Sequence, residues 1–530
     1  MLIVFAVAPI TIAILLFLIP AKKAAGAIAV VAQCAFFVSA FYVFMECKHG
    51  DIVTKVGDYR GLLGIVLKVD ALSSVFLLLT AFIFLVAVIY CVSEGYSRLF
   101  WFFLFAWQGL LGGLFLTEDI FNVFVLIEAA TVVVAALIMY NRDNRSMYDG
   151  MLYLMVNIVA MQFFIFGVGY IYKLTGTLDM TAAAEAMSSL DKSSLVLPFA
   201  LIMTAICLKC ALMPLFSWLP KAHGTPGAPT AVSAVLSGLH IKCAIYLFIR
   251  FRDVFSVIAT PDFFMVIGIV TGIGGALLAL SQTDVKLMLA YSTVSQIGMI
   301  IVGLNSPDPY AYTGSVYHMF NHAIFKSALF LCAGAVTHAY GTRDLGSIRG
   351  VLRKYPLLGV ATLMAVLGIT GTPFFSGSIS KYFITSGMHW VTEGFLFLNN
   401  LGTILVFIKF STMLFGRAPD GLSDEKIDVN KQAVVLVLGA ICLAGGIFGE
   451  RFIGFLFGVD VNVDIAGYVE KAVLFVVSVI VGYFIYRFFV DKHRFFRKMR
   501  ELDLSFRWVC ASIGGFFALT LIVVRLFGAA

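Results

Sequence analysis

Long apolar segments, separated by short polar connections, follow one another along almost the whole chain. A helix needs about 20 mainly apolar residues to cross a bilayer, and about sixteen segments meet that requirement. They lie near residues 2–20, 24–46, 70–93, 98–117, 119–140, 149–173, 194–221, 228–250, 262–281, 286–304, 313–339, 356–388, 392–416, 433–458, 468–489 and 509–527. The pattern therefore predicts an all-α polytopic membrane protein without a long soluble insertion.

The composition supports a membrane protein and argues against a soluble or nucleic-acid-binding one. Of the 530 residues, 61% are hydrophobic and 13% are charged, which is about half the charged share of a soluble protein. The mean hydropathy is +0.99. The net charge of +7 needs no nucleic-acid partner, because membrane proteins concentrate Lys and Arg on their cytoplasmic side.

The polar connections predict the orientation of the chain. If Lys22 and Lys23 are cytoplasmic, strict alternation of spans places the basic connections 141–145, 341–354 and 491–500 on the same side. The acidic segment 458–464 then lies on the other side. This distribution predicts a multi-pass protein of the cytoplasmic membrane with both termini outside. The first span has no basic region before it and no cleavage-like site, so we expect an anchor.

Nine cysteines raise the question of a metal or redox site. Most lie inside apolar runs, where cysteine acts as a small hydrophobic residue: Cys34, Cys91, Cys243, Cys332 and Cys442. Cys207 and Cys210 form a C-x-x-C pair, but no second pair or histidine cluster accompanies it. We therefore predict no disulfide, no zinc or iron–sulfur site and no other cofactor.

Charged or titratable residues interrupt five of the spans well away from their ends. A charged side chain at the bilayer centre costs about 3 kcal/mol on insertion scales, so each such residue calls for a structural or functional explanation. These residues are Glu128, Lys209, Lys242, the group His318, His322 and Lys326, and Lys381. The spacing of the group places its three side chains on one stripe of a helix. Snorkelling towards the surface is the alternative for Lys209 and Lys381.

Helix-breaking residues accompany two of these lysines. Pro214 and Pro220 follow Lys209, whereas Gly371, Pro373 and Gly377 precede Lys381. A broken helix exposes backbone groups that lipid cannot satisfy, so such breaks are tolerated where they line a polar cavity inside the protein. We therefore expect unwound segments near 209–214 and 371–377.

The two broken spans occupy corresponding places in two blocks. Each is the fourth of five spans, in residues 98–252 and 262–416. Because five is odd, the second block must run inverted relative to the first, as in many secondary transporters. Residues 1–97 and 417–530 then form N-terminal and C-terminal helices outside the repeats.

Several long motifs resemble a known family. They are "TEDIFNVFVLIEA", "LKCALMPLFSWLPKAHGTPGAPTAVSAVLSGLHIKCAIYLFIR", "TDVKLMLAYSTVSQIG", "HMFNHAIFKSALFLCAGAV" and "GTPFFSGSISK". The chain resembles, over about residues 65–420, the proton-translocating antiporter-like subunits of respiratory complex I, Mrp-type cation/proton antiporters and membrane-bound NiFe hydrogenases. The version "WLPKAHGTPGAPTAVSA" is most similar to the D subunit of Mrp antiporters and its hydrogenase relatives.

The resemblance implies roles for the intramembrane residues. Glu128 matches the family's fifth-span glutamate and Lys209 its seventh-span lysine, which form an ion pair. Lys242 matches the eighth-span lysine, and His318 and His322 match histidines of the eleventh span. Lys381 matches the twelfth-span lysine on the exit side, where some complex I members have glutamate.

The resemblance also implies partners, while two features depart from it. We expect other membrane subunits of one complex, including further antiporter-like subunits, and a peripheral hydrogenase or dehydrogenase arm is a further candidate partner. The family core has about fourteen spans, whereas this chain adds two after residue 465. Their link, 490–508, is too short for the long lateral helix of the largest complex I antiporter-like subunit.

The residues and the resemblance together predict proton movement along a buried Glu/Lys/His row. Burial favours neutral lysine and a nearby carboxylate favours the charged form, so making or breaking one ion pair can change protonation along the row. The main alternative is a subunit that itself carries Na⁺, although hard cations prefer clustered oxygens. A purely structural anchor would leave the charged residues in five spans unexplained. A redox enzyme would need a set of cofactor ligands, which the sequence does not provide. We predict no catalytic chemistry of the chain's own.

Overall fold

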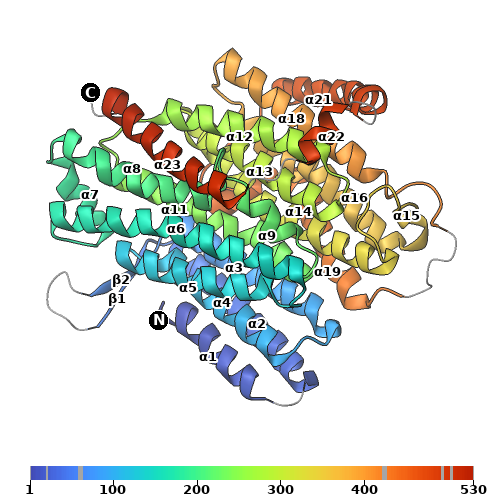
Figure 1. Ribbon diagram of the computed structural model, residues 1–530, viewed down its shortest axis with the longest axis horizontal. Helices are drawn as coiled ribbons and strands as arrows, with labels where there is room; N and C mark the ends of the chain where they lie inside the picture. Colours follow the sequence, from blue (N-terminus) through green and yellow to red (C-terminus); the bar gives the residue numbers. More distant parts are fainter. Residues whose placement is uncertain are drawn as a thin grey trace.

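The computed structural model describes residues 2–19, 22–57, 64–419, 426–490, 494–501 and 505–528, and it is almost wholly helical (Figure 1). The helices are α1 Val4–Leu18, α2 Lys22–Cys47, α3 Ala71–Cys91, α4 Arg98–Leu116, α5 Ile120–Ile138, α6 Asn144–Thr175, α7 Met180–Ser188, α8 Lys192–Lys209, α9 Trp218–Gly224, α10 Thr230–Val235, α11 Ile241–Val254, α12 Pro261–Ser281, α13 Val285–Leu304, α14 Pro309–Tyr340, α15 Val351–Lys354, α16 Pro356–Thr370, α17 Ser376–Ile384, α18 Trp390–Ser411, α19 Val429–Ile447, α20 Gly449–Phe457, α21 Ile465–Ile485, α22 Arg494–Arg500 and α23 Phe506–Val523. A π-helical turn, Leu236–His240, joins α10 to α11.

The number of spans agrees with the prediction from hydropathy. Fourteen described helices are long and apolar enough to cross a membrane, and α1 and α16 are shorter apolar helices. The predicted span 356–388 is α16 followed by α17, and the predicted span 433–458 contains α19 and α20. The fold class is confirmed.

The hydropathy pattern did not predict a β-hairpin that the structure contains. Strands β1 Ile52–Val56 and β2 Ile65–Val69 form an antiparallel hairpin before α3. The hairpin packs on the end of α4 through a bridge between Leu67 and Thr117. Its five-residue strands are too short to stand out beside spans of about 20 apolar residues.

Both expected helix interruptions are present. α8 ends at Lys209 and α9 begins at Trp218, while α16 ends at Thr370 and α17 begins at Ser376. Each unwound segment holds a non-glycine residue with positive φ, Ala211 (53°) in the first and Phe374 (69°) in the second. Such backbone costs about 1–3 kcal/mol and persists only where surrounding contacts impose it.

Two predicted breakers lie outside the unwound segments. Pro220 is in the first turn of α9, where proline needs no intrahelical N–H bond. Gly377 is the second residue of α17. A Cβ atom there would lie 1.9 Å from the carbonyl oxygen of Gly368, so this glycine permits the two halves of the broken helix to approach.

The helix triplets α4–α6 and α12–α14 share an internal pattern. Asp119 caps α5, and its backbone forms an isolated antiparallel β-bridge with that of Asp179. In the same way, Asp284 caps α13, and its backbone forms such a bridge with that of Asp344. The second pair lies 165 residues after the first. α6 and α14 each have 32 residues. The chain therefore uses one three-helix arrangement twice.

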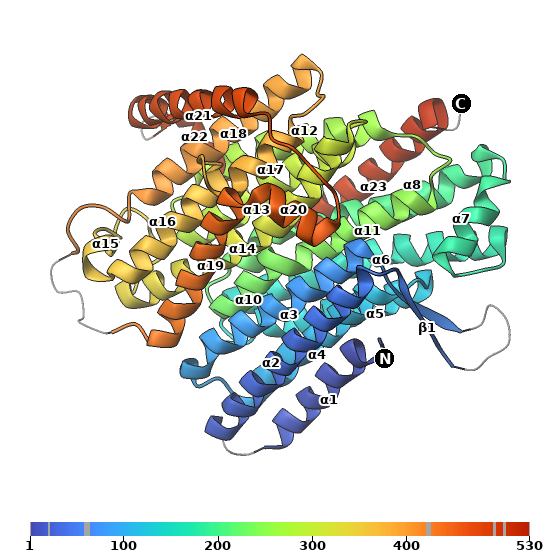
Figure 2. The ribbon, with the colours of Figure 1, turned by 180° about the vertical axis from the view of Figure 1, so that it is seen from behind.

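The two copies point in opposite directions. The Asp119 bridge adjoins the hairpin, since Glu118 N–H donates to the carbonyl of Val66, and the Asp284 bridge precedes α15. Both views place the hairpin, α7 and the two chain ends at one end of the molecule and α15 at the other (Figures 1 and 2).

The five-helix boundaries 98–252 and 262–416 stay a prediction. The side chains of Lys22 and Lys23, and residues 491–493, lie outside the described part.

The C-terminal helices fold back over both copies. α21 packs on α18, α22 contacts α12, and α23 packs on α8 and α6 (Figure 1). The two additional spans therefore lie on opposite halves of the chain, and the short α22 lies between them in sequence.

Replacement of Gly377 by alanine should destabilise the protein. The new Cβ would overlap backbone of α16, which cannot yield like a flexible side chain, and we expect a loss of about 1–3 kcal/mol. The melting midpoint of the purified protein in detergent measures this. Gly514→Ala is the control, because no atom lies within 4 Å of its Cβ position; an unchanged midpoint for Gly377→Ala would contradict the close approach.

Candidate functional site

Lys209 is the last residue of α8 and lies at the first interruption. Its side chain is 6% exposed, and its Nζ donates to Thr131 Oγ1 of α5 at 2.8 Å. The final carbonyls of a half-helix carry partial negative charge, which favours a cation at this place. The hydrogen-bond partner of Lys209 thus comes from the neighbouring helix α5, and the end of α8 adds the favourable field of its final carbonyls.

His240, which the sequence pattern did not single out, lies beside Lys209. It ends the π-helical turn; Trp107 Nε1–H donates to its Nδ1 at 3.3 Å, and Tyr153 Oη lies 3.4 Å from its Nε2. A cavity of about 20 Å³, with room for about one water, is lined by Lys209, His240 and apolar residues. A water there would bond to Lys209 Nζ, and it would reach His240 only by replacing the long contact with Tyr153.

Lys242 joins the two halves of the chain directly. Its side chain is fully buried, and Nζ contacts the carbonyl of Ser237 at 2.5 Å and Nδ1 of His322 on α14. Nε2 of His322 is buried without a hydrogen-bond partner in the described structure. Because two titratable nitrogens touch in the interior, a proton can pass between them without moving the backbone.

His318 continues this arrangement towards the second interruption. Its ring centroid is 6.2 Å from that of His322. Its nitrogens contact Ser380 Oγ at 2.8 Å and Gln296 Oε1 at 3.0 Å. Ser380 directly precedes Lys381 on α17, so the histidine stripe leads to the second lysine at a helix break.

Lys381 bonds both to the broken helix and to its neighbour. Nζ donates to the carbonyl of Ile369, in the last turn of α16, and to Asn400 Oδ1 of α18, each at 2.7 Å. Lys326 is also buried, and its Nζ donates to the carbonyl of Leu289 at 2.8 Å and to Ser292 Oγ of α13. Oxygen atoms therefore lie beside each of these lysines.

The ion pair expected between Glu128 and Lys209 is not formed. Among the described residues no ion pair joins them, and Glu128 Oε1 is buried without a hydrogen-bond partner. Lys209 bonds instead to Thr131, which is about one helical turn further along α5. The prediction of a direct pair was wrong because a matching motif does not fix side-chain geometry.

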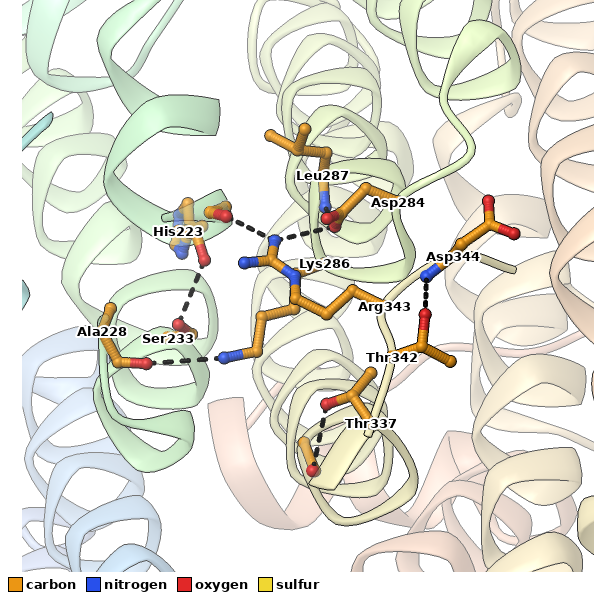
Figure 3. Close-up of polar contacts among 12 residues, drawn as sticks. His223, Ala228, Ser233, Asp284, Lys286, Leu287, Thr337, Thr342, Arg343 and Asp344 are labelled. Atoms are coloured by element: carbon orange, nitrogen blue, oxygen red, sulfur yellow. Dashed lines mark hydrogen bonds and ion pairs between the residues drawn. The ribbon is translucent and has the colours of Figure 1, made fainter. Parts of the chain in front are cut away.

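A second polar cluster lies where the two halves meet near the α15 end (Figure 3). The guanidinium of Arg343 bonds to Asp284 at 2.8 Å and to the carbonyl of Gly224, the last residue of α9. Lys286 Nζ is 3.4 Å from the carbonyl of Ala228. Both ring nitrogens of His223 are buried without a partner in the described structure.

A wide cavity leads from the α15 end to this cluster. Its volume is about 800 Å³, and charged or polar residues of both halves line it, among them Glu94, Asn141, Lys286, His338, Arg343 and Lys431. Asp428 also lines it; the hydrogen bond from Lys431 holds the pKa of this carboxyl below its usual value. Water from one side of the membrane can therefore approach Lys286.

His223, His240 and Lys286 escaped selection from the sequence for two reasons. His223 and Lys286 stand close to span ends, where charge is common and carries little signal. His240 stands two residues before Lys242, but an ideal helix does not place positions i and i+2 on one face. The π-helical turn changes that register, and π-turns are frequent at functional sites.

Comparisons with known proteins agree with the fold. The family described as "NADH:quinone oxidoreductase/Mrp antiporter, TM" matches residues 117–408. The chain is 32% identical over 345 residues to the D subunit of the Na(+)/H(+) antiporter of Alkalihalophilus pseudofirmus, covering 63% of this chain and 69% of that protein. It is 30% identical over 421 residues to the N subunit of the NADH-quinone oxidoreductase of Desulforudis audaxviator, covering 74% and 83%. A chain of the Mrp complex from Dietzia sp. DQ12-45-1b superposes with a TM-score of 0.80 at 24% identity, covering 89% of this chain and 99% of that one.

Glu128→Gln should leave the stability of the protein unchanged, because the carboxylate makes no direct ion pair with Lys209. Breaking a buried pair would cost about 3–5 kcal/mol. Thermal unfolding in detergent distinguishes the two cases, and Asp284→Asn is the comparison, since it removes the negative charge from a direct ion pair with Arg343. A large loss for Glu128→Gln would show that a direct pair exists in the membrane.

Proposed function

Because the chain belongs to the NADH:quinone oxidoreductase/Mrp antiporter family of transmembrane subunits, we propose that it moves protons within a multisubunit ion-pumping complex. The direct contact between Lys242 and His322 carries this proposal. It joins titratable groups of two separate helices in the fully buried interior.

Direct contacts join Lys242 to His322 and His318 to Ser380, and water would have to bridge the other steps of the proposed path. Water in the large cavity at the α15 end delivers protons to the cluster around Lys286 and His223. The central row consists of Lys209, His240, Lys242, His322 and His318, with Lys326 beside it. Lys381 is the last residue of the proposed proton path and lies towards the end of the molecule that holds the two termini. Glu128 acts through space by favouring the charged form of Lys209.

Protons fit this row better than sodium ions do. Na⁺ requires several oxygen ligands around one point, whereas the side chains that meet at the centre are lysines and histidines, whose charged forms repel a metal cation. Each can bind or release one proton. The relative named as the D subunit of a Na(+)/H(+) antiporter keeps transport of Na⁺ by this chain as the second candidate function.

The subunit would work in the cytoplasmic membrane with both termini outside. The basic connections of the α15 end support this orientation. Its partners would be other membrane subunits, including further antiporter-like ones, as the names of its relatives suggest. Any electron transfer would belong to a peripheral hydrogenase or dehydrogenase arm, and the chain would supply no catalytic chemistry itself.

Substitution of single residues of the row, or of Glu128 beside it, should slow proton movement. We expect Lys209→Ala, Lys242→Ala and Glu128→Gln each to lower the initial rate at least about tenfold, which corresponds to a barrier increase of about 1.4 kcal/mol. The assay is acidification of vesicles carrying the whole complex. Lys173→Ala, at an exposed lysine of α6, is the control. Normal rates for assembled Lys209→Ala and Lys242→Ala complexes would refute the proposal.

The choice of ion can be tested without a mutation. If protons move along the lysine–histidine row, acidification should persist when choline replaces sodium inside and outside the vesicles. Lysine and histidine side chains bind and release protons without a metal ion. A protonophore should abolish it. Loss of acidification that only added sodium restores would favour the second candidate function.

A further inference from the structure

The additional helix α21 forms one wall of a partly open cavity at Lys381. The cavity has a volume of about 330 Å³ and lies between α17, α18 and α21. Lys381 of α17 and Asn400 of α18 line it together with Ala472 and Ser478 of α21. Without α21 this space would be open to lipid, and Lys381 would face the membrane interior.

Polar side chains lie among the apolar ones in the walls of this cavity and provide places where water can bind. A cavity stays dry when its walls are apolar and holds water when the water finds two to four polar partners. Here the walls carry hydroxyl, amide and charged side chains: Ser378, Lys381, Tyr382, Thr385, Glu393, Asn400, Tyr468, Lys471 and Ser478. A volume of about 330 Å³ has room for several waters.

Direct bonds hold α21 against the broken helix. Lys471 Nζ forms an ion pair with Glu393 of α18, and Tyr468 Oη lies 2.8 Å from Ser378 Oγ of α17. Glu393 and Lys471 are 40% and 36% exposed, so this pair lies at the rim of the cavity. Both views place the hairpin and the chain ends opposite α15, and α18 and α21 begin on that same side (Figures 1 and 2).

We infer that α21 completes a water-filled passage between Lys381 and the membrane surface that holds the chain termini. The inference rests on the proposed function, in which Lys381 releases protons. It assigns the first additional helix a part in transport: α21 keeps lipid away from Lys381 and provides the polar wall along which a proton leaves. The Glu393–Lys471 pair fixes this helix at the mouth of the passage.

Two neighbouring positions of α21 test the inference. Ala472 lines the cavity, whereas Val473 is 59% exposed on the outer side of the helix. A thiol reacts as the thiolate, which forms in water and not in lipid. We expect a membrane-impermeant charged thiol reagent to modify Ala472→Cys about tenfold faster than Val473→Cys in vesicles that expose the termini. In both variants Cys34 and Cys510, the thiols that are not buried, are replaced by serine.

A second readout connects the passage to transport. Modification of Ala472→Cys with a bulky charged reagent should slow acidification at least about fivefold, while Val473→Cys treated identically should keep its rate. Equal and slow labelling of both cysteines would show that lipid fills the cavity and would overturn the inference. Rapid labelling of Ala472→Cys without loss of acidification would overturn the assigned exit route. These results are distinct from failure of the proposed function, because labelling does not depend on pumping.

Discussion

A lysine at mid-membrane depth must either lose its charge or find oxygen atoms to bond, because lipid offers none. In this chain the lysines of the proposed row have such oxygen partners. Lys381 bonds the carbonyl of Ile369 and the amide oxygen of Asn400, and Lys209 bonds the hydroxyl of Thr131. These partners stabilise the charged form without fixing it, since neutral oxygen acceptors hold a proton less firmly than a carboxylate does.

The interruptions of α8 and α16 follow from this constraint. Ending a helix inside the membrane frees carbonyl groups at the place where a cation needs them, as the bond from Lys381 to the last turn of α16 shows. The strained residues Ala211 and Phe374 are the cost of those turns. One interruption follows each of the triplets α4–α6 and α12–α14 along the chain. The contact between Lys242 and His322 joins the two halves.

Much of this arrangement was predictable from the sequence, because the signals were strong and local. Apolar segments, two sets of breakers and lysines in apolar surroundings indicated the spans and the broken helices. The details that failed depend on tertiary geometry. A π-helical turn rotates His240 into contact with Trp107 and Tyr153, and the rotamers of Glu128 and Lys209 leave them without a direct bond. Gly377 is needed for a close approach to Gly368, which no helix propensity encodes.

The central claim is that Lys209, His240, Lys242, His322, His318 and Lys381 form one continuous hydrated row. Electron cryomicroscopy of the assembled complex in lipid nanodiscs, at a resolution that shows ordered water, tests it most directly. The account predicts density for a water between Lys209 and His240 and further waters from His318 to Lys381 and its cavity. A row interrupted by packed apolar side chains, or a cavity filled by lipid density, would contradict it.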